Sequence, residues 1–447
     1  KEDDFLLLAS VDESTGYTIY TWDLPAHELV IRKGIDNLVI DGTYKVMDLY
    51  VGQGKEEEVF GDWFKIQDLP RIQARPLAGW TSWYYHYTRI SAEIVEANLK
   101  AFSSRQIPLD LIQIDDGWQP AVGDWLESND KFPLGMKALV DSIHSHGYQA
   151  GLWLAPFIVE RNSGIFKEHR DWLLTYDGEH LVKGGFNPLW GGVLNGYFYI
   201  LDLRKTEVRK YLTTVMDQVL NQWGFDLVKL DFLYAIALIP LSNKSRGQIM
   251  SEAMDFLREI CGEKLILGCG VPLGPSFGKV DYCRIGCDTH LNWELNIMRK
   301  AGLRERISTF TTLRDTIGRR QLNQHAFLND PDVYILRNEK TKLSEEQKLT
   351  LFYVNQIFGS MVLTSDDITT YDEATLALYR LQFPVKFRKI TRVEEAGLLK
   401  KVWFEMEDRK YFAAINLGDE TVSVSLEEGL WYERTLGFIS GAKEIQL

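Results

Sequence analysis

The stretch "DLVKLDFLY" (residues 226–234) decides how the sequence is interpreted. Apolar residues dominate it, as in a buried strand, but Lys229 and Asp231 interrupt the run. Charged side chains are rarely buried without a partner, because an isolated buried charge is costly in free energy. Residues two apart on a strand point to the same face. Lys229 and Asp231 are therefore expected to enter one common space, while the apolar residues between them pack on the other side.

This strand belongs to a long alternation of short apolar runs and stretches with helical periodicity. Just before it, apolar residues recur every three or four positions over 208–220, and Gly224 follows as a stop signal. The candidate strands lie at 75–83, 110–118, 148–156, 226–232, 264–270, 281–288, 325–330 and 359–366. Eight strands alternating with helices predict an α/β fold, a (β/α)8 TIM barrel. A doubly wound open sheet is the alternative, but no Gly-rich phosphate fingerprint follows the first strand.

The regions on both sides of the barrel carry the period of two that is typical of antiparallel strands. Residues 1–74 contain short apolar segments separated by turn signals, which predicts an N-terminal β-sandwich-like region. Residues 75–384 form the predicted catalytic barrel, and residues 385–447 a small C-terminal antiparallel β domain. Because the chain begins with Lys1 rather than Met, we expect the N-terminal region to be incomplete.

Charge and hydropathy argue against two classes of partner. The net charge is −13 and no run of Lys or Arg marks a basic patch, so nucleic acid is not an expected partner. The apolar run "FLYAIALIPL" spans only residues 232–241, about half of the ~20 residues of a membrane helix. No membrane partner is therefore expected, and the N-terminus shows no signal-peptide pattern.

The cysteines could indicate a metal site, because they cluster in the sequence. They are Cys261, Cys269, Cys283 and Cys287. Their spacing contains no CxxC motif and no histidine pair completes a ligand set, so no metal is expected. Unpaired thiols in a reducing compartment are the better interpretation, which predicts a cytoplasmic location.

Polar residues collect at the C-terminal ends of the predicted strands, where the active site of a TIM barrel lies. They are Asp115 and Asp116 after the second strand, Trp153 in the third, Lys229 and Asp231 in the fourth, Cys269 after the fifth, and Arg284 and Asp288 in the sixth. Taken singly, each has an ordinary explanation. The aspartate pair could cap a helix or bind calcium, Arg284 and Asp288 could form a plain ion pair, and "NDPD" (329–332) is interpreted as turn chemistry. Their convergence on one barrel mouth favours a functional site.

The two charges of the opening strand also predict a division of roles. Lys229 favours the ionised form of Asp231, which suits a nucleophile or charge stabiliser rather than a proton donor. Asp288 would then be the proton donor, provided that burial favours its protonated form. Two carboxyls in opposite protonation states are the equipment for glycosidic bond cleavage, and they stand about 5–5.5 Å apart in retaining enzymes.

At these positions the chain resembles glycoside hydrolase family 36, the α-galactosidases, in the clan that includes families 27 and 31. The matching motifs, in family order, are "GWTSWYYHY" (79–87), "QIDDGW" (113–118), "GLWLAPF" (151–157), "VKLDF" (228–232), "ILGCGVPLGP" (266–275), "RIGCDT" (284–289) and "FLNDPD" (327–332). Each motif alone is weak, but seven in order across the predicted barrel are specific.

The resemblance implies a retaining, exo-acting α-galactosidase on raffinose-type oligosaccharides, with no metal or organic cofactor. Asp231 matches the family's nucleophile and Asp288 its general acid/base. The sugar-contacting positions match Trp83, Tyr84, Asp115, Asp116, Trp153, Lys229, Cys269 and Arg284, with the aspartate pair as ligands of hydroxyls O4 and O6. Family members are often oligomeric, so a homo-oligomer is a further expectation.

Two departures from the family pattern stand out. The family's N-terminal β-sandwich is usually longer, and a tryptophan that it supplies to the pocket rim can be aligned with neither Trp22 nor Trp63. Cys287 stands where proline is common just before the acid/base.

Other functions remain open at this point. An α-N-acetylgalactosaminidase, or a galactosyltransferring relative such as a raffinose synthase, would use the same scaffold and the same carboxyls. A Schiff-base lyase using Lys229 would be a different reaction class. A glycan-binding module without turnover is the non-enzymatic alternative, although both carboxyls are present.

Overall fold

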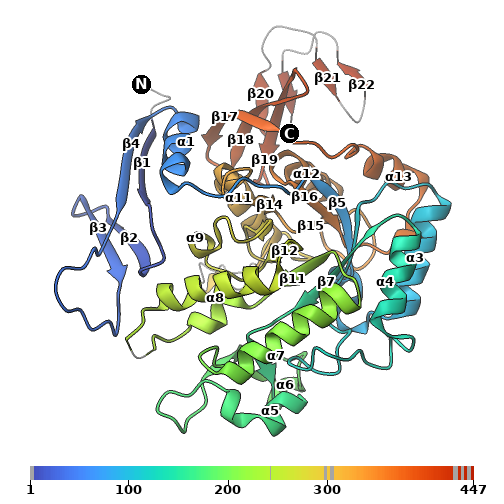
Figure 1. The fold of residues 1–447 in the computed structure, drawn as a ribbon. Helices are drawn as coiled ribbons and strands as arrows, with labels where there is room; N and C mark the ends of the chain where they lie inside the picture. Colours follow the sequence, from blue (N-terminus) through green and yellow to red (C-terminus); the bar gives the residue numbers. More distant parts are fainter. Residues whose placement is uncertain are drawn as a thin grey trace.

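Nine parallel strands form the central sheet of the computed structural model (Figure 1). The structure describes residues 5–241, 243–295, 300–302 and 307–425, and the backbone of 431–433, 437–439 and 444–446. The sheet order is β14-β13-β12-β11-β7-β6-β5-β16-β15. The bounds are β5 Leu77–Thr81, β6 Leu111–Ile114, β7 Gln149–Leu154, β11 Leu227–Leu230, β12 Leu265–Gly268, β13 Tyr282–Arg284, β14 Leu328–Asp330, β15 Val333–Tyr334 and β16 Met361–Thr364.

The first and last strands of this order, β14 and β15, follow each other directly in the sequence. Only Pro331 and Asp332 separate β14 from β15, and the Ser360 amide before β16 donates to the Asn329 carbonyl in β14 at 2.9 Å. The sheet is therefore curled into a TIM-barrel-like core. Each of the eight predicted strand segments contains one of its strands, and β15 continues the seventh. The strands are short apolar runs buried on both faces, as parallel strands covered by helices require.

Helices with one apolar stripe cover the outside of the sheet (Figure 1). They are α3 Ala92–Ser104, α4 Gly135–Ser145, α7 Thr206–Asp217, α8 Arg246–Cys261, α11 Thr309–Gly318, α12 Glu345–Phe358 and α13 Glu373–Arg380. In α4 the stripe is Met136, Leu139, Val140 and Ile143, all buried at helical spacing. Shorter elements connect them: α2 Trp83–His86, α9 Leu273–Ser276, η1 Tyr87–Arg89, η2 Arg170–Trp172, η3 Gln218–Gln222, η4 Leu233–Ala237, η5 Arg320–Leu322 and η6 Ile368–Thr370.

Between β7 and α7 the chain makes an excursion from the barrel. Three antiparallel strands, β8 Ile158–Glu160, β9 Lys183–Phe186 and β10 Tyr197–Ile200, pair in the order β8-β10-β9. The short helices α5 Gly164–Glu168 and α6 Gly192–Asn195 belong to the same excursion, at the bottom of Figure 1.

The N-terminal region consists of two antiparallel ribbons and one helix. β1 Phe5–Ser10 pairs with β4 Leu49–Gly54, and β2 Tyr17–Asp23 pairs with β3 Glu28–Gly34. The helix, α1 Glu56–Gln67, was not predicted from the sequence. Three glutamates in its first turn and Lys65 in its last turn interact favourably with the helix dipole. The region packs against the start of α8, where the Ser245 hydroxyl donates to the Thr15 carbonyl at 2.8 Å.

The C-terminal region is antiparallel, as the period-two pattern predicts. β17 Lys389–Ala396, β18 Leu399–Met406 and β19 Arg409–Asn416 form one sheet. Beyond it, β20 Ser423–Ser425 pairs with β23 Glu444–Gln446, and β21 Trp431–Glu433 with β22 Gly437–Ile439.

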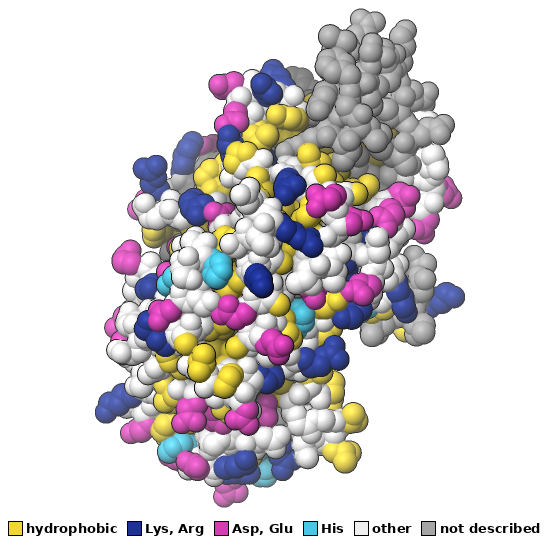
Figure 2. Space-filling model, turned by 90° about the vertical axis from the view of Figure 1, so that its right-hand side faces the viewer, with side chains coloured by type: hydrophobic (Ala, Val, Ile, Leu, Met, Phe, Trp, Pro, Cys, Tyr) yellow, Lys and Arg dark blue, Asp and Glu magenta, His cyan; other side chains and the backbone are white. Residues whose placement is uncertain are grey.

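The surface shows no segregation of charge on the face drawn in Figure 2, where basic and acidic side chains are interspersed. In the described part of the chain, no helix combines the length and the apolar character that crossing a membrane requires.

Candidate active site

Asp231 follows β11 directly, at the C-terminal end of the strand. Its carboxylate accepts two N–H groups: the Trp153 indole donates to Oδ2 at 3.1 Å, and the Phe232 amide donates to Oδ1 at 2.7 Å. Trp153 comes from β7, which pairs with β11 so that Lys229 lies opposite Trp153. Neighbouring parallel strands therefore bring the two side chains together, as the convergence of strand ends predicts.

Lys229 is buried and pairs with Asp115, whose Oδ2 lies 2.7 Å from the lysine Nζ. Burial disfavours the lysine's charge, but the Asp115 carboxylate outweighs this and raises the pKa of Lys229 above its ordinary value. The direct ionic partner of Lys229 is therefore Asp115, a pairing that the sequence did not predict. The amide of Gln113 also donates to that oxygen, at 3.1 Å.

Asp116 is buried beside this pair and has different partners. The Gln119 amide donates to its Oδ1 at 2.7 Å, and the Trp190 indole donates to its Oδ2 at 2.8 Å. Burial raises the pKa of Asp116 to about 6, and the two hydrogen bonds oppose that rise by favouring the charged form.

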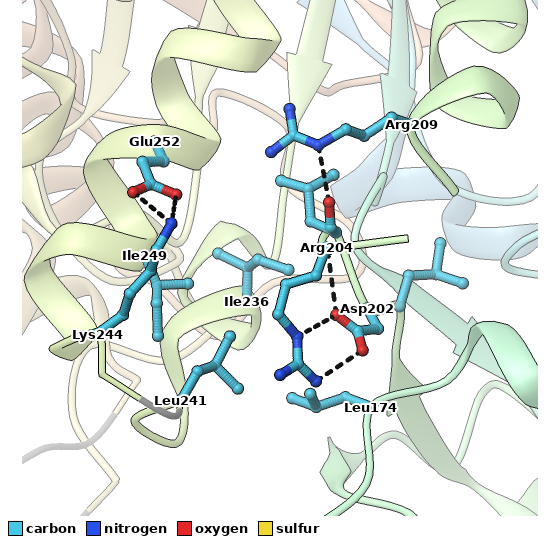
Figure 3. A pocket seen from close by; sticks show the side chains of 11 residues that line it. Leu174, Asp202, Arg204, Arg209, Ile236, Leu241, Lys244, Ile249 and Glu252 are labelled. Carbon is cyan, nitrogen blue, oxygen red and sulfur yellow. Dashed lines mark hydrogen bonds and ion pairs between the residues drawn. The ribbon is translucent and has the colours of Figure 1, made fainter. Parts of the chain in front are cut away.

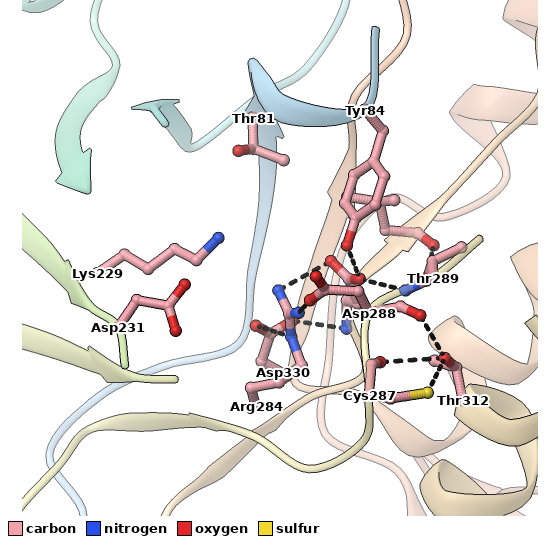
Figure 4. A network of polar contacts seen from close by, with 12 residues as sticks. Thr81, Tyr84, Lys229, Asp231, Arg284, Cys287, Asp288, Thr289, Thr312 and Asp330 are labelled. Atoms are coloured by element: carbon pink, nitrogen blue, oxygen red, sulfur yellow. Dashed lines mark hydrogen bonds and ion pairs between the residues drawn. The ribbon is translucent and has the colours of Figure 1, made fainter. Parts of the chain in front are cut away.

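Arg284, at the end of β13, lies at the centre of a second polar group (Figure 4). Its guanidinium contacts Asp288 Oδ1 at 2.9 Å, Asp330 Oδ2 at 3.0 Å and Asp332 Oδ1 at 2.8 Å. Asp330 lies opposite Arg284 in the pairing of β13 with β14. The "NDPD" stretch, interpreted from sequence as turn chemistry, therefore supplies two carboxylates to the candidate site.

Asp332 connects Arg284 to a second predicted residue. Its Oδ2 accepts the Tyr84 hydroxyl and the Thr289 amide, the latter at 2.7 Å. Burial raises the pKa of Asp332 to about 6, and Arg284 opposes the rise. Burial and the nearby charges of Asp288 and Asp332 raise the pKa of the Tyr84 hydroxyl, so this phenol stays protonated and donates.

Asp288 is the exposed member of this group, since 49% of its side chain is accessible. The condition that burial would favour its protonated form is therefore not met. In Figure 4 its side chain and those of Lys229 and Asp231 point toward each other from opposite sides.

Cys287, which stands where the family often has proline, packs against α11. The Thr312 hydroxyl of α11 lies 3.3 Å from the Cys287 thiol and donates to the Asp288 carbonyl at 3.2 Å.

The remaining predicted residues differ in their burial and in their distance from the candidate site. Cys269 is buried after β12, and burial followed by the charge of Asp231 raises the pKa of its thiol well above the ordinary value. Trp83 is partly exposed and packs edge-on against Tyr87, with ring centroids 5.2 Å apart. Of the two N-terminal tryptophans, Trp63 donates to the Ser10 carbonyl and packs on Phe64, whereas Trp22 is 59% exposed on β2.

Sequence reasoning missed four residues of the site: Gln119, Trp190, Asp330 and Asp332. Gln119 follows "IDDGW" closely and could have been found by extending that motif. Trp190 lies in the excursion, where only a tryptophan followed by two glycines marks it.

A pocket of about 280 Å³ lies elsewhere, between the excursion and α8 (Figure 3). Arg204 pairs with Asp202 on one wall and Lys244 with Glu252 on the other. It contains no predicted site residue. Within the described ranges, no cluster of three or more His, Cys, Asp or Glu side chains could hold a metal ion.

Together the two polar groups form a site with carboxyls on both sides. Asp231 is held by neutral N–H donors, and Asp288 is held by a shared cation. Buried carboxylates, amides and indoles around them can bind a hydroxyl-rich ligand by multiple hydrogen bonds.

Comparison with known proteins places this chain in a family. The family model described as Melibiase matches residues 66–258. Alpha-galactosidase 1 of Pediococcus pentosaceus is 26% identical over 199 residues, which are 41% of this chain and 24% of that protein. The chain thus matches about a quarter of that relative's length.

Solved structures extend the likeness to nearly the whole chain. TtGalA, an α-galactosidase from Thermus thermophilus solved with p-nitrophenyl α-D-galactopyranoside, is 30% identical. That alignment has a TM-score of 0.74 and covers 90% of this chain and 77% of the other. The family 36 α-galactosidase AgaA from Geobacillus stearothermophilus shares the fold at 15% identity, with a TM-score of 0.60 and coverage of 89% and 59%. The chain belongs to the α-galactosidase family, in the clan of glycoside hydrolase families 27 and 36.

Proposed function

We propose that the chain is an exo-acting α-galactosidase that releases terminal α-galactosyl residues from raffinose-type oligosaccharides with retention of configuration. One observation carries the proposal: Asp231 and Asp288 come from different strand ends and point toward each other across the site (Figure 4). A pair of carboxyls flanking the scissile bond is the catalytic equipment of retaining glycosidases.

In this proposal Asp231 is the nucleophile. The Trp153 indole and the Phe232 amide each donate to one of its oxygens, which stabilises and orients the carboxylate without giving it a proton. It attacks the anomeric carbon and forms a covalent galactosyl intermediate, through an oxocarbenium-like transition state.

Asp288 is the general acid and then the general base. The Arg284 guanidinium holds its carboxylate and also contacts Asp330 and Asp332. Asp330 and Asp332 are buried, whereas Asp288 is half exposed and can pass a proton to the leaving oxygen. In the second step it removes a proton from the attacking water.

The sugar ring would lie between the two groups, against Trp153. Asp115, Asp116 and Lys229 would bind its hydroxyls O4 and O6, and Trp83, Tyr84, Cys269 and Arg284 complete the proposed pocket. A site built to hydrogen-bond a hydroxyl strongly rejects an analogue that cannot supply it. The Thermus relative was also solved with stachyose, which supports an oligosaccharide of this type as the substrate.

The Schiff-base alternative loses support, because imine formation needs a neutral lysine. Lys229 is ion-paired with buried Asp115, which raises its pKa. An α-N-acetylgalactosaminidase or a galactosyltransferase would keep both carboxyl roles and differ only in the sugar or the acceptor.

The direct test is a kinetic screen of aryl α-glycosides, followed by proton NMR of the first anomer released. We expect turnover of the α-galactoside well above that of the N-acetylgalactosaminide, with α-galactose released first. Faster turnover of the N-acetylgalactosaminide, dominant transfer to sucrose, or β-galactose as the first product would each contradict the proposal.

Two further expectations belong to the same proposal. Buried thiols at Cys261, Cys269 and Cys283 suit a reducing compartment such as the cytoplasm, which cell fractionation tests. A homo-oligomer is expected by likeness to the family, and a monomeric mass by light scattering would contradict it.

A further inference from the structure

Trp190 is a buried residue of the excursion, and it lies outside all seven family motifs. It is 4% exposed and precedes α6, where Gly191 and Gly192 both have positive φ, of 103° and 76°. Side chains rarely adopt such angles, so the two glycines allow the sharp turn that follows the tryptophan. The turn carries the Trp190 indole from the excursion into the candidate site.

The Trp190 indole contacts Asp116 and the aromatic residues next to Asp231. Its N–H donates to Asp116 Oδ2 at 2.8 Å. Its ring lies 6.3 Å from Trp153, which donates to Asp231, and 5.1 Å from Phe232, which follows Asp231 in the chain. Among the described residues, no other group donates to Asp116 Oδ2, and the Gln119 amide donates to Oδ1.

We propose that Trp190 is a positioning residue that fixes the Asp116 carboxylate for recognition of the galactosyl hydroxyls. The inference rests on the proposed function, in which Asp116 binds sugar hydroxyls. With one N–H on each oxygen, the carboxylate cannot turn about its terminal bond without losing a hydrogen bond. Its remaining lone pairs then point in fixed directions, which is the preorganisation that binding a sugar hydroxyl requires.

The hydrogen bond also affects how activity depends on pH. The charged or titratable groups near Asp116 are Asp115, Asp231, Glu160 and Lys131. Three of these are carboxyls, so the N–H donors are needed to keep Asp116 ionised in a buried place. Removing the Trp190 N–H would raise the pKa of Asp116 further, and the acid limb of the pH profile would move to higher pH.

The experiment compares Trp190→Phe with Trp125→Phe. Both substitutions keep a buried aromatic ring and remove an indole N–H. Trp125 packs on Trp153 with centroids 5.8 Å apart, and its N–H has no hydrogen-bond partner among the described residues. It is therefore a matched control for the loss of an indole within the same aromatic cluster.

With an aryl α-galactoside, we expect Trp190→Phe to lower kcat/KM by about tenfold to a hundredfold, chiefly through KM, because it removes a hydrogen bond to a charged group. The acid limb should move upward only in this variant, and Trp125→Phe should stay within about threefold of wild type. In an Asp116→Asn background, Trp190→Phe should cost less than about threefold, because the bond it removes no longer serves a carboxylate.

Equal losses in both backgrounds, or equal losses from the two tryptophan variants, would overturn the role of Trp190 while leaving the proposed function intact. Absence of turnover by the wild-type chain on every aryl α-galactoside would overturn the proposed function itself, and this inference with it.

Discussion

The two halves of the site hold their carboxyls by different means. On the β7–β11 side, neutral N–H donors from Trp153 and Phe232 hold Asp231, and the buried Lys229 is ion-paired with Asp115. On the β13–β14 side, a single guanidinium is shared by three carboxylates, and Asp288 is half exposed. The two donors on Asp231 fix its carboxylate in one orientation, whereas the half-exposed side chain of Asp288 is open to a leaving group and to water. The contrast matches the nucleophile and acid/base roles.

The largest effects should come from removing the two carboxyls, and they should differ in kind. Asp231→Gly should lower kcat by about 10⁴-fold or more on every substrate, because no covalent intermediate can form. Asp288→Ala should lose activity most on raffinose, whose leaving group needs a proton, and least on aryl galactosides with acidic leaving groups. Parallel kinetics on both substrates measure this. An equal loss of activity on both substrates in Asp288→Ala would contradict the acid/base role of Asp288.

Removing the cation of the first half should cost stability. Lys229→Met leaves Asp115 buried and unpaired, so the free energy of unfolding should fall by about 3–5 kcal/mol. The matched control is Lys244→Met, which breaks an exposed pair with Glu252 and should change it by at most about 1 kcal/mol. Urea titrations measure both. Equal effects would show that the Lys229 pair contributes no more than a surface pair.

The raised pKa of Asp116 should make the stability of the folded chain depend on pH. Its pKa rises from an ordinary 3.8 to about 6 in the folded chain, so the folded state binds the proton more tightly than the unfolded state. This contribution is fully present below pH 3.8 and is lost as pH rises through about 6, an effect of up to about 3 kcal/mol. Asp116→Asn should therefore gain stability relative to wild type as pH rises across that window. A constant difference would contradict this.

The smallest effect concerns Gly270, which lies against the nucleophile. A Cβ on Gly270 would lie 3.2 Å from Asp231 Oδ1, and the residue has φ of 55°. Gly262, on the other side of β12, has φ of 57° with nothing near its Cβ. Both alanine variants should lose about 1–2 kcal/mol of stability from backbone strain. Only Gly270→Ala should also lower kcat, by roughly tenfold, because it crowds Asp231. Equal kcat values in the two variants would contradict that contact.

The barrel strands were predictable because each is a short apolar run bounded by turns or helical periodicity. Lys229 and Asp231 were predictable because a period of two in a buried run leaves charges only where they have partners. The partner of each side chain was not predictable, because it depends on strands that are distant in the sequence. Lys229 pairs with Asp115, which follows β6, and not with its near neighbour Asp231.

The other omissions have equally physical reasons. "NDPD" has the composition of an ordinary turn, and only the register of β13 on β14 places Arg284 beside Asp330. Trp190 reaches Asp116 through an excursion that has no periodic pattern. The exposure of Asp288 depends on a loop conformation that the motif "RIGCDT" does not encode.

The central claim is the assignment of Asp231 as nucleophile and Asp288 as acid/base, and azide rescue tests it most directly. With an activated aryl α-galactoside and azide, Asp231→Gly should give β-galactosyl azide, because a single displacement inverts the anomeric carbon. Asp288→Ala should give α-galactosyl azide, because azide then attacks the covalent intermediate. Proton NMR distinguishes the two products. An α-azide from Asp231→Gly together with a β-azide from Asp288→Ala would contradict the account by exchanging the two roles.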